Sequence, residues 1–299
     1  MNPQNLLQSP LSTQKCTLGC PILDRCLLGG IPCNSVTEFV AESGSGKTQL
    51  CLQLCLHAQL PVSRGGLAAS SLYLHTEFPF PFRRLYQLCE PFRSLNPHLY
   101  ANNNGSPCDF VYVQAVHSAD QLLDEMSKIE FFVKNSENRM PVRLIVIDSI
   151  AAVFRSEFDN TFCDLKKRSS LFFKISGKLK ELAKRFDMAV VVTNQVVDLV
   201  APNEGINGLR LGNLGTLCSS GRRVTPALGL AWANCVNSRL FLSRHEEIIG
   251  DKNGKVDENG CVLLSRLPEQ LHVVFAPHLP DSSCEFMITR EGVFGVERQ

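Results

Sequence analysis

An eight-residue segment rich in small residues could bind phosphate. Residues 41–48 read AESGSGKT, which is the P-loop pattern with Ala41 at the position of its first glycine. In such a loop the backbone N–H groups surround phosphate oxygens, and the start of the following helix adds positive potential. Lys47 can reach the β- and γ-phosphates, and the Thr48 hydroxyl can bind Mg²⁺. The pattern predicts a binding site for a nucleoside triphosphate, formed by Ala41, Glu42, Ser43, Gly44, Ser45, Gly46, Lys47 and Thr48.

Three further polar residues directly follow apolar runs that read as strands. They are Glu77, Asp148 and Gln195. The carboxyl ends of parallel strands form the ligand-binding edge of a sheet, so we expect these side chains to converge with the P-loop. Asp148 would hold Mg²⁺ together with Thr48, Glu77 would activate a water, and Gln195 would sense the γ-phosphate. Each residue alone could be an ordinary strand-end or surface residue. Four strand ends that each supply one suitable group favour a catalytic site.

The elements that must position these residues alternate between strand and helix patterns. Apolar runs predict strands over 35–40, 71–76, 110–114, 142–147, 188–193, 238–243, 271–276 and 284–289. Helical periodicity predicts helices over 49–59, 119–133 and 165–186, with a short one after Pro226. This alternation predicts an α/β fold with a central, mostly parallel sheet flanked by helices. We expect residues 1–15 to be a disordered tail and residues 16–299 to be one domain, because no break in composition divides them.

Composition restricts the class of protein. The 299 residues include 30 basic and 29 acidic side chains, and 44% of the residues are apolar. This balance excludes a uniformly basic protein and global disorder, but it conceals a local excess of charge. Between Asp164 and Asp187 there are eight basic and three acidic residues. The thirteen cysteines match no common zinc spacing, and with no secretory signal they indicate reduced thiols in an intracellular protein. No apolar stretch is long enough for a membrane helix, so we expect no membrane partner.

Several motifs together resemble the RecA-like strand-exchange recombinases, and most closely the eukaryotic recombinase and its paralogues. The shared motifs are LGCPILDRCLLGGI at 18–31, the P-loop followed by Gln49, YLHTE at 73–77, LIVIDS at 144–149 and VVTNQV at 191–196. Residues 221–244 and 276–293 are similar to one paralogue group in particular. The resemblance covers residues 16 to 296. It implies a RecA-like P-loop ATPase core that binds ATP and Mg²⁺.

The resemblance also implies residues that contact ATP across a subunit interface. Arg84 aligns with the family arginine that lies against the adenine. Pro277 and Pro280 align with the segment that one subunit lays over its neighbour's nucleotide, although a rigid loop between strands would also account for two prolines. The eukaryotic recombinase has a helical domain and a Phe-x-x-Ala tether before its core, whereas no Phe precedes Phe39 here. We therefore expect a hetero-complex with other recombinase paralogues rather than a long homofilament.

Two loops are expected to face DNA, as they do in the family. The first spans about 154–168 and the second about 196–225. Basic side chains there would bind the phosphates of single-stranded or branched DNA without reading its sequence. Phe154 and Phe158 could stack on bases, whereas Trp232 lies in an apolar helix and is expected to pack in the core. The DNA-binding candidates are Arg155, Lys166, Lys167, Arg168, Arg222 and Arg223, and the second loop also holds Arg210.

The resemblance implies that the chain assists homologous-recombination repair of DNA double-strand breaks. It also implies a role in meiosis. The expected activity is weak, DNA-dependent ATP hydrolysis, in the nucleus, with the cytoplasm as a second expected location. Two alternatives remain open at this point. The chain could be a non-catalytic P-loop scaffold that holds other recombinase subunits, or a self-sufficient strand-exchange recombinase.

Overall fold

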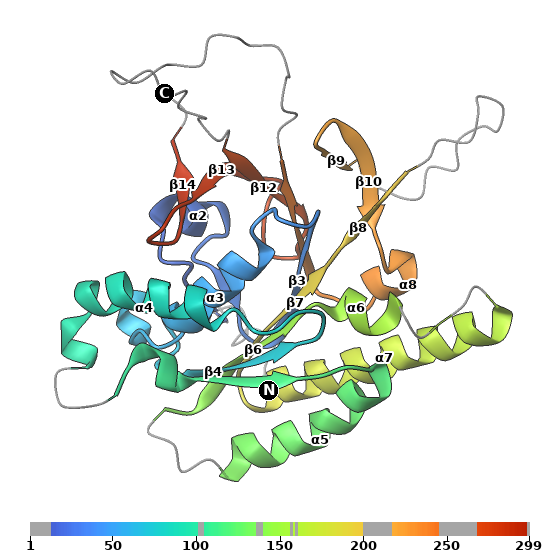
Figure 1. The fold of residues 1–299 in the computed structure, drawn as a ribbon, viewed down its shortest axis with the longest axis horizontal. Helices are drawn as coiled ribbons and strands as arrows, with labels where there is room; N and C mark the ends of the chain where they lie inside the picture. Colours follow the sequence, from blue (N-terminus) through green and yellow to red (C-terminus); the bar gives the residue numbers. More distant parts are fainter. Residues whose placement is uncertain are drawn as a thin grey trace, which may run out of the picture.

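A computed structural model describes residues 13–100, 105–135, 140–155, 158, 161–199, 217–244 and 268–297. Within these residues nine strands form one sheet, in the order β14-β13-β12-β11-β3-β7-β6-β4-β5 (Figure 1). Six neighbouring strands are parallel: β11 (Ser238–Ser243), β3 (Ser35–Ala41), β7 (Ala189–Asn194), β6 (Val142–Asp148), β4 (Ser70–His75) and β5 (Val111–Ala115). The antiparallel strands are β12 (Glu269–Phe275), β13 (Ser283–Ile288) and β14 (Val293–Val296). The predicted α/β fold with a mostly parallel sheet is confirmed.

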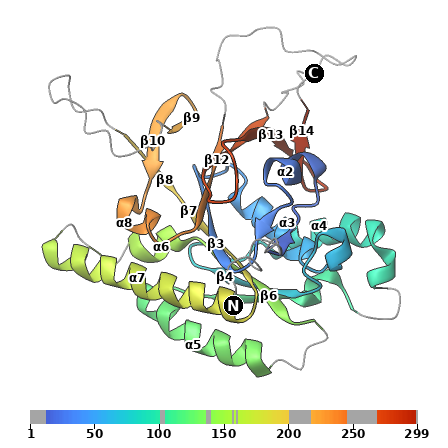
Figure 2. The ribbon, with the colours of Figure 1, turned by 180° about the vertical axis from the view of Figure 1, so that it is seen from behind.

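Helices cover both faces of this sheet (Figures 1 and 2). One apolar cluster joins the sheet to α2 (Pro21–Cys26), α3 (Lys47–His57) and α4 (Phe82–Leu95). A second cluster joins the other face to α5 (Ala119–Asn135), α6 (Ile150–Arg155), α7 (Phe162–Arg185) and α8 (Gly229–Ala233). Strands such as β6 and β7 are therefore continuous apolar runs, since both of their faces are buried. None of the described helices could cross a bilayer, because each is too short or too polar.

The longest helix, α7, begins earlier than its periodicity predicts. The Thr161 hydroxyl accepts a hydrogen bond from the Asp164 backbone N–H, which caps the helix and starts it at Phe162 rather than 165. Its buried face includes Phe172, Ile175, Leu179 and Leu182. Leu165, which the pattern placed on the same face, is exposed.

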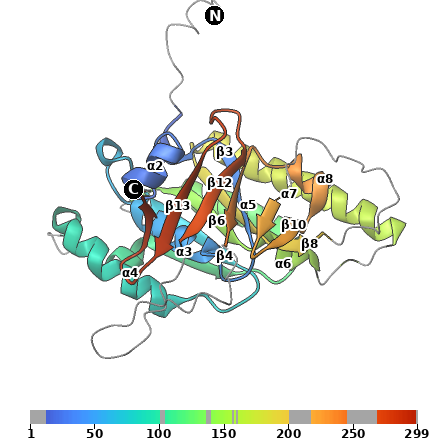
Figure 3. The same cartoon turned by 90° about the horizontal axis from the view of Figure 1, so that it is seen from above.

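Smaller elements complete the described structure. Strand β1 (Lys15–Cys16) pairs with β2 (Ile31–Pro32), so Lys15 belongs to a strand although we placed it in the tail. A second sheet contains β8 (Val196–Asp198), β10 (Arg222–Pro226) and β9 (Leu217–Ser219), and it lies beside α8 (Figures 1 and 3). Three short 3-10 helices are η1 (Val62–Arg64), η2 (Pro97–Leu99) and η3 (Pro107–Phe110).

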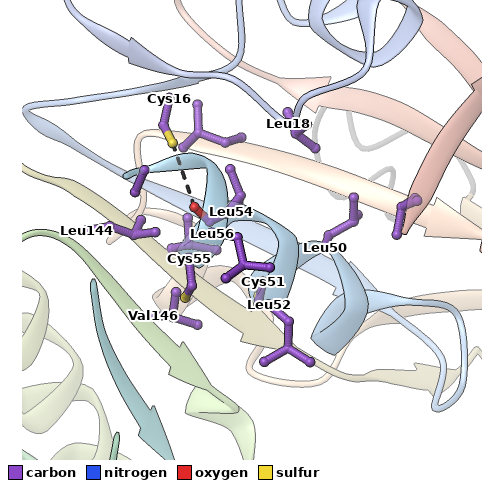
Figure 4. Close-up of a cluster of buried hydrophobic side chains, with 14 of the residues drawn as sticks. Cys16, Leu18, Leu50, Cys51, Leu52, Leu54, Cys55, Leu56, Leu144 and Val146 are labelled. Atoms are coloured by element: carbon purple, nitrogen blue, oxygen red, sulfur yellow. Dashed lines mark hydrogen bonds between the residues drawn. The ribbon is translucent and has the colours of Figure 1, made fainter. Parts of the chain in front are cut away.

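Several cysteines are structural residues of the core (Figure 4). Cys51 and Cys55 lie on α3 and, like Cys16, are fully buried. Burial raises the pKa of all three thiols, and that of Cys55 to about 12. These groups therefore stay protonated at neutral pH and pack as small apolar side chains.

A buried polar network ties the centre of the sheet to α8. The Glu38 carboxylate on β3 accepts hydrogen bonds from Trp232 Nε1 at 2.9 Å and from Asn194 Nδ2 at 2.8 Å. Its second oxygen pairs with Arg239 Nε on β11 at 2.5 Å. The expected core position of Trp232 is confirmed, since its side chain is fully buried.

Candidate functional site

The P-loop joins β3 to α3 through a backbone that requires glycine. Gly44 and Gly46 have φ values of +81° and +86°, in the left-handed region that glycine adopts without strain. A Cβ on Gly46 would lie 2.8 Å from Ile288 Cδ1, so the space is also restricted. Ala41 is the last residue of β3 and pairs in register with Leu242. Its backbone is therefore in the ordinary strand conformation, which does not require glycine.

Lys47 is folded back under this loop. Its Nζ donates to the carbonyl oxygens of Ala41 at 2.8 Å and Glu42 at 2.7 Å. Burial lowers the pKa of Lys47, and the negative charge of Asp148 partly opposes that effect. A cation held in this way lies beside the backbone N–H groups that are expected to surround phosphate.

Asp148 receives hydrogen bonds from three hydroxyl groups. Oδ2 accepts from Thr48 Oγ1 and from the Tyr73 hydroxyl, each at 2.6 Å, and Oδ1 accepts from Thr193 Oγ1 at 2.5 Å. Burial raises the pKa of Tyr73, and the charge of Asp148 raises it further, so the phenol remains a donor. We predicted that Thr48 and Asp148 meet at a Mg²⁺ site, but Tyr73 and Thr193 were missed. Both lie on the two strands that flank β6, Tyr73 on β4 and Thr193 on β7, and this adjacency was the only signal that could have indicated them.

Glu77, Gln195 and Arg155 form a second polar cluster at this edge of the sheet. Gln195 Nε2 donates to Glu77 Oε2 at 2.8 Å, and Gln195 Oε1 accepts from Arg155 Nη2. Arg155 Nη2 also lies 3.5 Å from Glu77 Oε1. Arg155 was expected to contact DNA, whereas its guanidinium contacts the two candidate catalytic residues in the structure.

Lys47, Thr48, Glu77, Asp148 and Gln195 line a pocket of 590 Å³. Its size falls in the range of small-molecule and cofactor sites. Arg84 of α4 forms one wall and donates to Gln49 Oε1, Gln87 Oε1 and the carbonyl oxygens of Thr289 and Arg290. Burial lowers the pKa of Arg84. Lining residues predicted from the sequence are Ser43, Gly44, Gly46, Lys47, Thr48, Glu77, Arg84, Asp148 and Gln195.

Three residues of the P-loop lie behind this surface. Ala41 belongs to β3, and Ser45 is fully buried with no hydrogen-bond partner for its hydroxyl among the described residues. Glu42 faces the small sheet instead of the pocket. It pairs with Arg222 Nη2 at 2.5 Å and accepts a hydrogen bond from Ser220 Oγ at 2.8 Å.

The remaining DNA-binding candidates lie on two different elements. Lys166, Lys167 and Arg168 lie in the first turns of α7 rather than in a loop, because the helix begins at Phe162. Lys166 and Lys167 are exposed, whereas Arg168 is partly buried over the ring of Phe172.

On the small sheet, Arg223 is exposed, while Arg222 pairs with Asp198 at 3.0 Å as well as with Glu42. Arg210 lies outside the described residues. Phe154 is 2% exposed and packs on Phe172, so the expectation that it stacks on bases is wrong. Phe158, stacked on Phe154, is partly exposed.

Pro277 and Pro280 lie in the turn between β12 and β13, and both are exposed. Strand β12 is antiparallel to β11, which runs parallel to β3. The turn therefore lies at the edge of the sheet opposite the P-loop. This placement separates the two prolines from the pocket of their own chain.

Comparisons with known proteins give a consistent result. The family model described as Rad51 matches residues 11–208. The chain is 62% identical to the DNA repair protein XRCC3 homolog of Arabidopsis thaliana, over 99% of this chain and 98% of that protein. It is 36% identical to the DNA repair protein XRCC3 of Mus musculus, over 96% of this chain and 77% of the relative. Identity to the mouse DNA repair protein RAD51 homolog 2 is 34%, over 78% of this chain and 65% of that protein.

Proposed function

This chain belongs to the Rad51 family and takes part in recombinational DNA repair, and from that premise we propose that it is an ATP-dependent accessory subunit of a recombinase complex. One observation carries the proposal. The P-loop and the ends of β4, β6 and β7 bring a lysine, two carboxylates and an amide to a single pocket of 590 Å³. In RecA-like ATPases such a combination binds a nucleoside triphosphate and activates water.

Phosphate binding is assigned to the P-loop. The backbone N–H groups around Gly44 and Gly46 and the start of α3 would bind the phosphate oxygens. Lys47 would exchange its two carbonyl acceptors for β- and γ-phosphate oxygens, which carry more negative charge. Arg84, at the α4 wall of the pocket, is positioned to lie against the base.

The residues that would hold Mg²⁺ have suitable chemistry. Thr48 and Asp148 line the pocket with a hydroxyl and a carboxylate whose oxygens are 2.6 Å apart, and Mg²⁺ prefers such oxygen ligands. Tyr73 and Thr193 would orient the Asp148 carboxylate through their hydroxyl hydrogen bonds. When bound, the ion neutralises part of the charge on the transferred phosphoryl group.

Hydrolysis is assigned to Glu77 and Gln195. Glu77 would accept a proton as a water oxygen attacks the γ-phosphorus, and ADP leaves from the opposite side. Gln195, whose amide lies beside Glu77 with Nε2 2.8 Å from Oε2, would contact the γ-phosphate. ATP would favour one geometry of the interface with a partner subunit, and its hydrolysis would release that geometry.

The hetero-complex and the DNA contacts are also part of the proposal. The turn with Pro277 and Pro280 would cover the nucleotide of a neighbouring recombinase paralogue, since it lies opposite the P-loop of its own chain. The exposed cations Lys166, Lys167 and Arg223 would bind DNA phosphates without reading sequence. A repair role of this kind implies action in the nucleus.

Nucleotide binding provides the first test. We expect Lys47→Ala to weaken the binding of a fluorescent ATP analogue at least tenfold, because a buried cation is lost from the phosphate site. Lys174→Ala, at an exposed position of α7, is the matched control and should bind as the wild type does. Unchanged ATP affinity in Lys47→Ala would contradict the site assignment.

A second pair of measurements separates a catalytic subunit from a scaffold. Glu77→Gln should keep ATP affinity and lose hydrolysis, whereas Lys47→Ala should lose both. Each variant is compared for ATP turnover, for capture of other recombinase paralogues and for repair in cells that lack the protein. If both variants retain the partners and full repair, the P-loop fold serves as a scaffold and the catalytic proposal is wrong.

A further inference from the structure

Arg155 links the end of α6 to both candidate catalytic residues. Its Nη2 lies 3.5 Å from Glu77 Oε1 and donates to Gln195 Oε1, while Gln195 Nε2 donates to Glu77 Oε2. The three side chains therefore form a closed triangle. In this arrangement the Gln195 amide oxygen and one of its N–H groups are both used within the triangle, and that N–H group points at Glu77.

The triangle is accessible to an exchanging ligand. The Arg155 side chain is 58% exposed and that of Glu77 is 30% exposed. A pair with this exposure is weak and screened by salt, so a competing anion can replace the carboxylate. A phosphodiester is such an anion, and a guanidinium binds phosphate with the same paired geometry that it uses for carboxylate.

We propose that Arg155 is a DNA-sensitive positioning residue, which holds Glu77 and Gln195 in a resting arrangement until a DNA phosphate takes its guanidinium. Release frees the Glu77 carboxylate to orient water and frees the Gln195 amide to contact the γ-phosphate. The inference rests on the proposed ATPase and DNA-binding functions. The inference adds to these functions the residue through which bound DNA would act on Glu77 and Gln195.

Arg155 is placed for this exchange by its position in the chain. It is the last residue of α6, and α7 begins seven residues later at Phe162. The first turns of α7 carry the exposed Lys166 and Lys167. A strand of DNA held by those lysines would bring its phosphates close to the end of α6, where Arg155 lies.

Competition between Glu77 and DNA can be measured without ATP turnover. Because coupling is reciprocal, removing the carboxylate charge should free Arg155 for DNA. We expect Glu77→Gln to strengthen binding to labelled oligo-dT about two- to fivefold, the scale of a half-exposed ion pair. The measurement uses the full chain with its co-purified partner, Mg²⁺ and a non-hydrolysable ATP analogue. In an Arg155→Ala background the same substitution should change DNA affinity less than 1.5-fold, roughly the smallest effect of such a pair.

Turnover gives an independent readout. Arg155→Ala should raise hydrolysis in the absence of DNA and bring the ratio of DNA-stimulated to DNA-free turnover close to one. Arg155→Lys should restore part of the stimulation, since it keeps the charge but lacks the planar fork. Arg93→Ala, at an exposed position near the end of α4, should behave as the wild type.

Two results would overturn the inference. One is an equal gain of DNA affinity from Glu77→Gln with and without Arg155, or no gain in either background. The other is a wild-type stimulation ratio in Arg155→Ala. Binding of ATP and of oligo-dT by the unmodified protein, measured in the same assay, tests the proposed function itself. If both ligands bind and the coupling is absent, only the role of Arg155 fails.

Discussion

The buried ion pair between Glu38 and Arg239 should be a main determinant of stability. The two side chains are 0% and 1% exposed, and their charged atoms are 2.5 Å apart. Glu38 also accepts from Trp232 and Asn194, so the pair joins β3, β7, β11 and α8 at the centre of the sheet. Among the described residues Arg239 Nη2 has no hydrogen-bond partner, and the guanidinium lies 5.3 Å from the centre of the Phe275 ring.

Removing either charge leaves the other buried and uncompensated. We expect Arg239→Met and Glu38→Gln each to lower the free energy of unfolding by about 3–5 kcal/mol. The double variant removes both charges, while the new amide still offers Trp232 and Asn194 an oxygen. It should therefore lose only about 1–3 kcal/mol, because a neutral hydrogen-bonded group remains. The resulting coupling energy is about 3 kcal/mol or more.

Urea unfolding of the full chain, followed by tryptophan fluorescence, provides the assay. The chain has one tryptophan, and it is the network residue Trp232 itself. Thermal midpoints should fall by roughly 6–15 °C in the single variants and by less in the double variant. Single-variant losses below about 1 kcal/mol, within the range of an exposed pair, would refute the reasoning. Losses that add in the double variant would refute it too.

Three further predictions concern the nucleotide site and the cysteines. Tyr73→Phe removes one hydrogen bond to Asp148 and should weaken Mg²⁺-dependent ATP binding about fivefold, which titration calorimetry at varied Mg²⁺ would detect. Gly46→Ala should abolish binding of the ATP analogue and lower the unfolding midpoint, because φ is +86° and the new Cβ would lie 2.8 Å from Ile288 Cδ1. A hydrogen bond with Cys284 lowers the pKa of Cys26 to about 6 despite partial burial. Its alkylation by iodoacetamide should therefore rise as the pH increases through about 6, a profile that peptide mass spectrometry can separate from an ordinary thiol near pH 8.5.

Local signals made most of the fold predictable. The strands from β3 to β7 are short apolar runs, and the P-loop is a contiguous pattern of residues, so periodicity and residue type were sufficient. The sheet order then brings Lys47, Asp148 and Gln195 together, because β3, β7 and β6 are neighbours. Helix α4 was missed, since the prolines around 79–81 and Pro91 conceal its periodicity. Strands β8 (VVD) and β10 (RRVTP) were missed because neither contains an apolar run long enough to read as a strand.

Partners across strands were not predictable from residue types. Tyr73 reads as an apolar strand residue, and its hydroxyl contact with Asp148 depends on the register of β4 against β6. Arg222 was assigned to DNA because it is a basic residue in a segment that faces DNA in the family. Charge does not reveal that Glu42, 180 positions away in the chain, provides the nearest anion. Tertiary packing determines which arginine pairs with which carboxylate, and no local pattern in a single sequence encodes it.

Two arginines from segments expected to face DNA pair with carboxylates at or behind the nucleotide site. Arg155 pairs with Glu77, and Arg222 pairs with Glu42. In each pair the arginine side chain is the more exposed partner. Arg155 is 58% exposed and Glu77 30%, while Arg222 is 55% exposed and Glu42 9%. An arriving phosphate would therefore take the arginine, while the carboxylate would remain in place. Communication between DNA and ATP would then need only the exchange of two side-chain contacts, and it would weaken as salt screens these pairs.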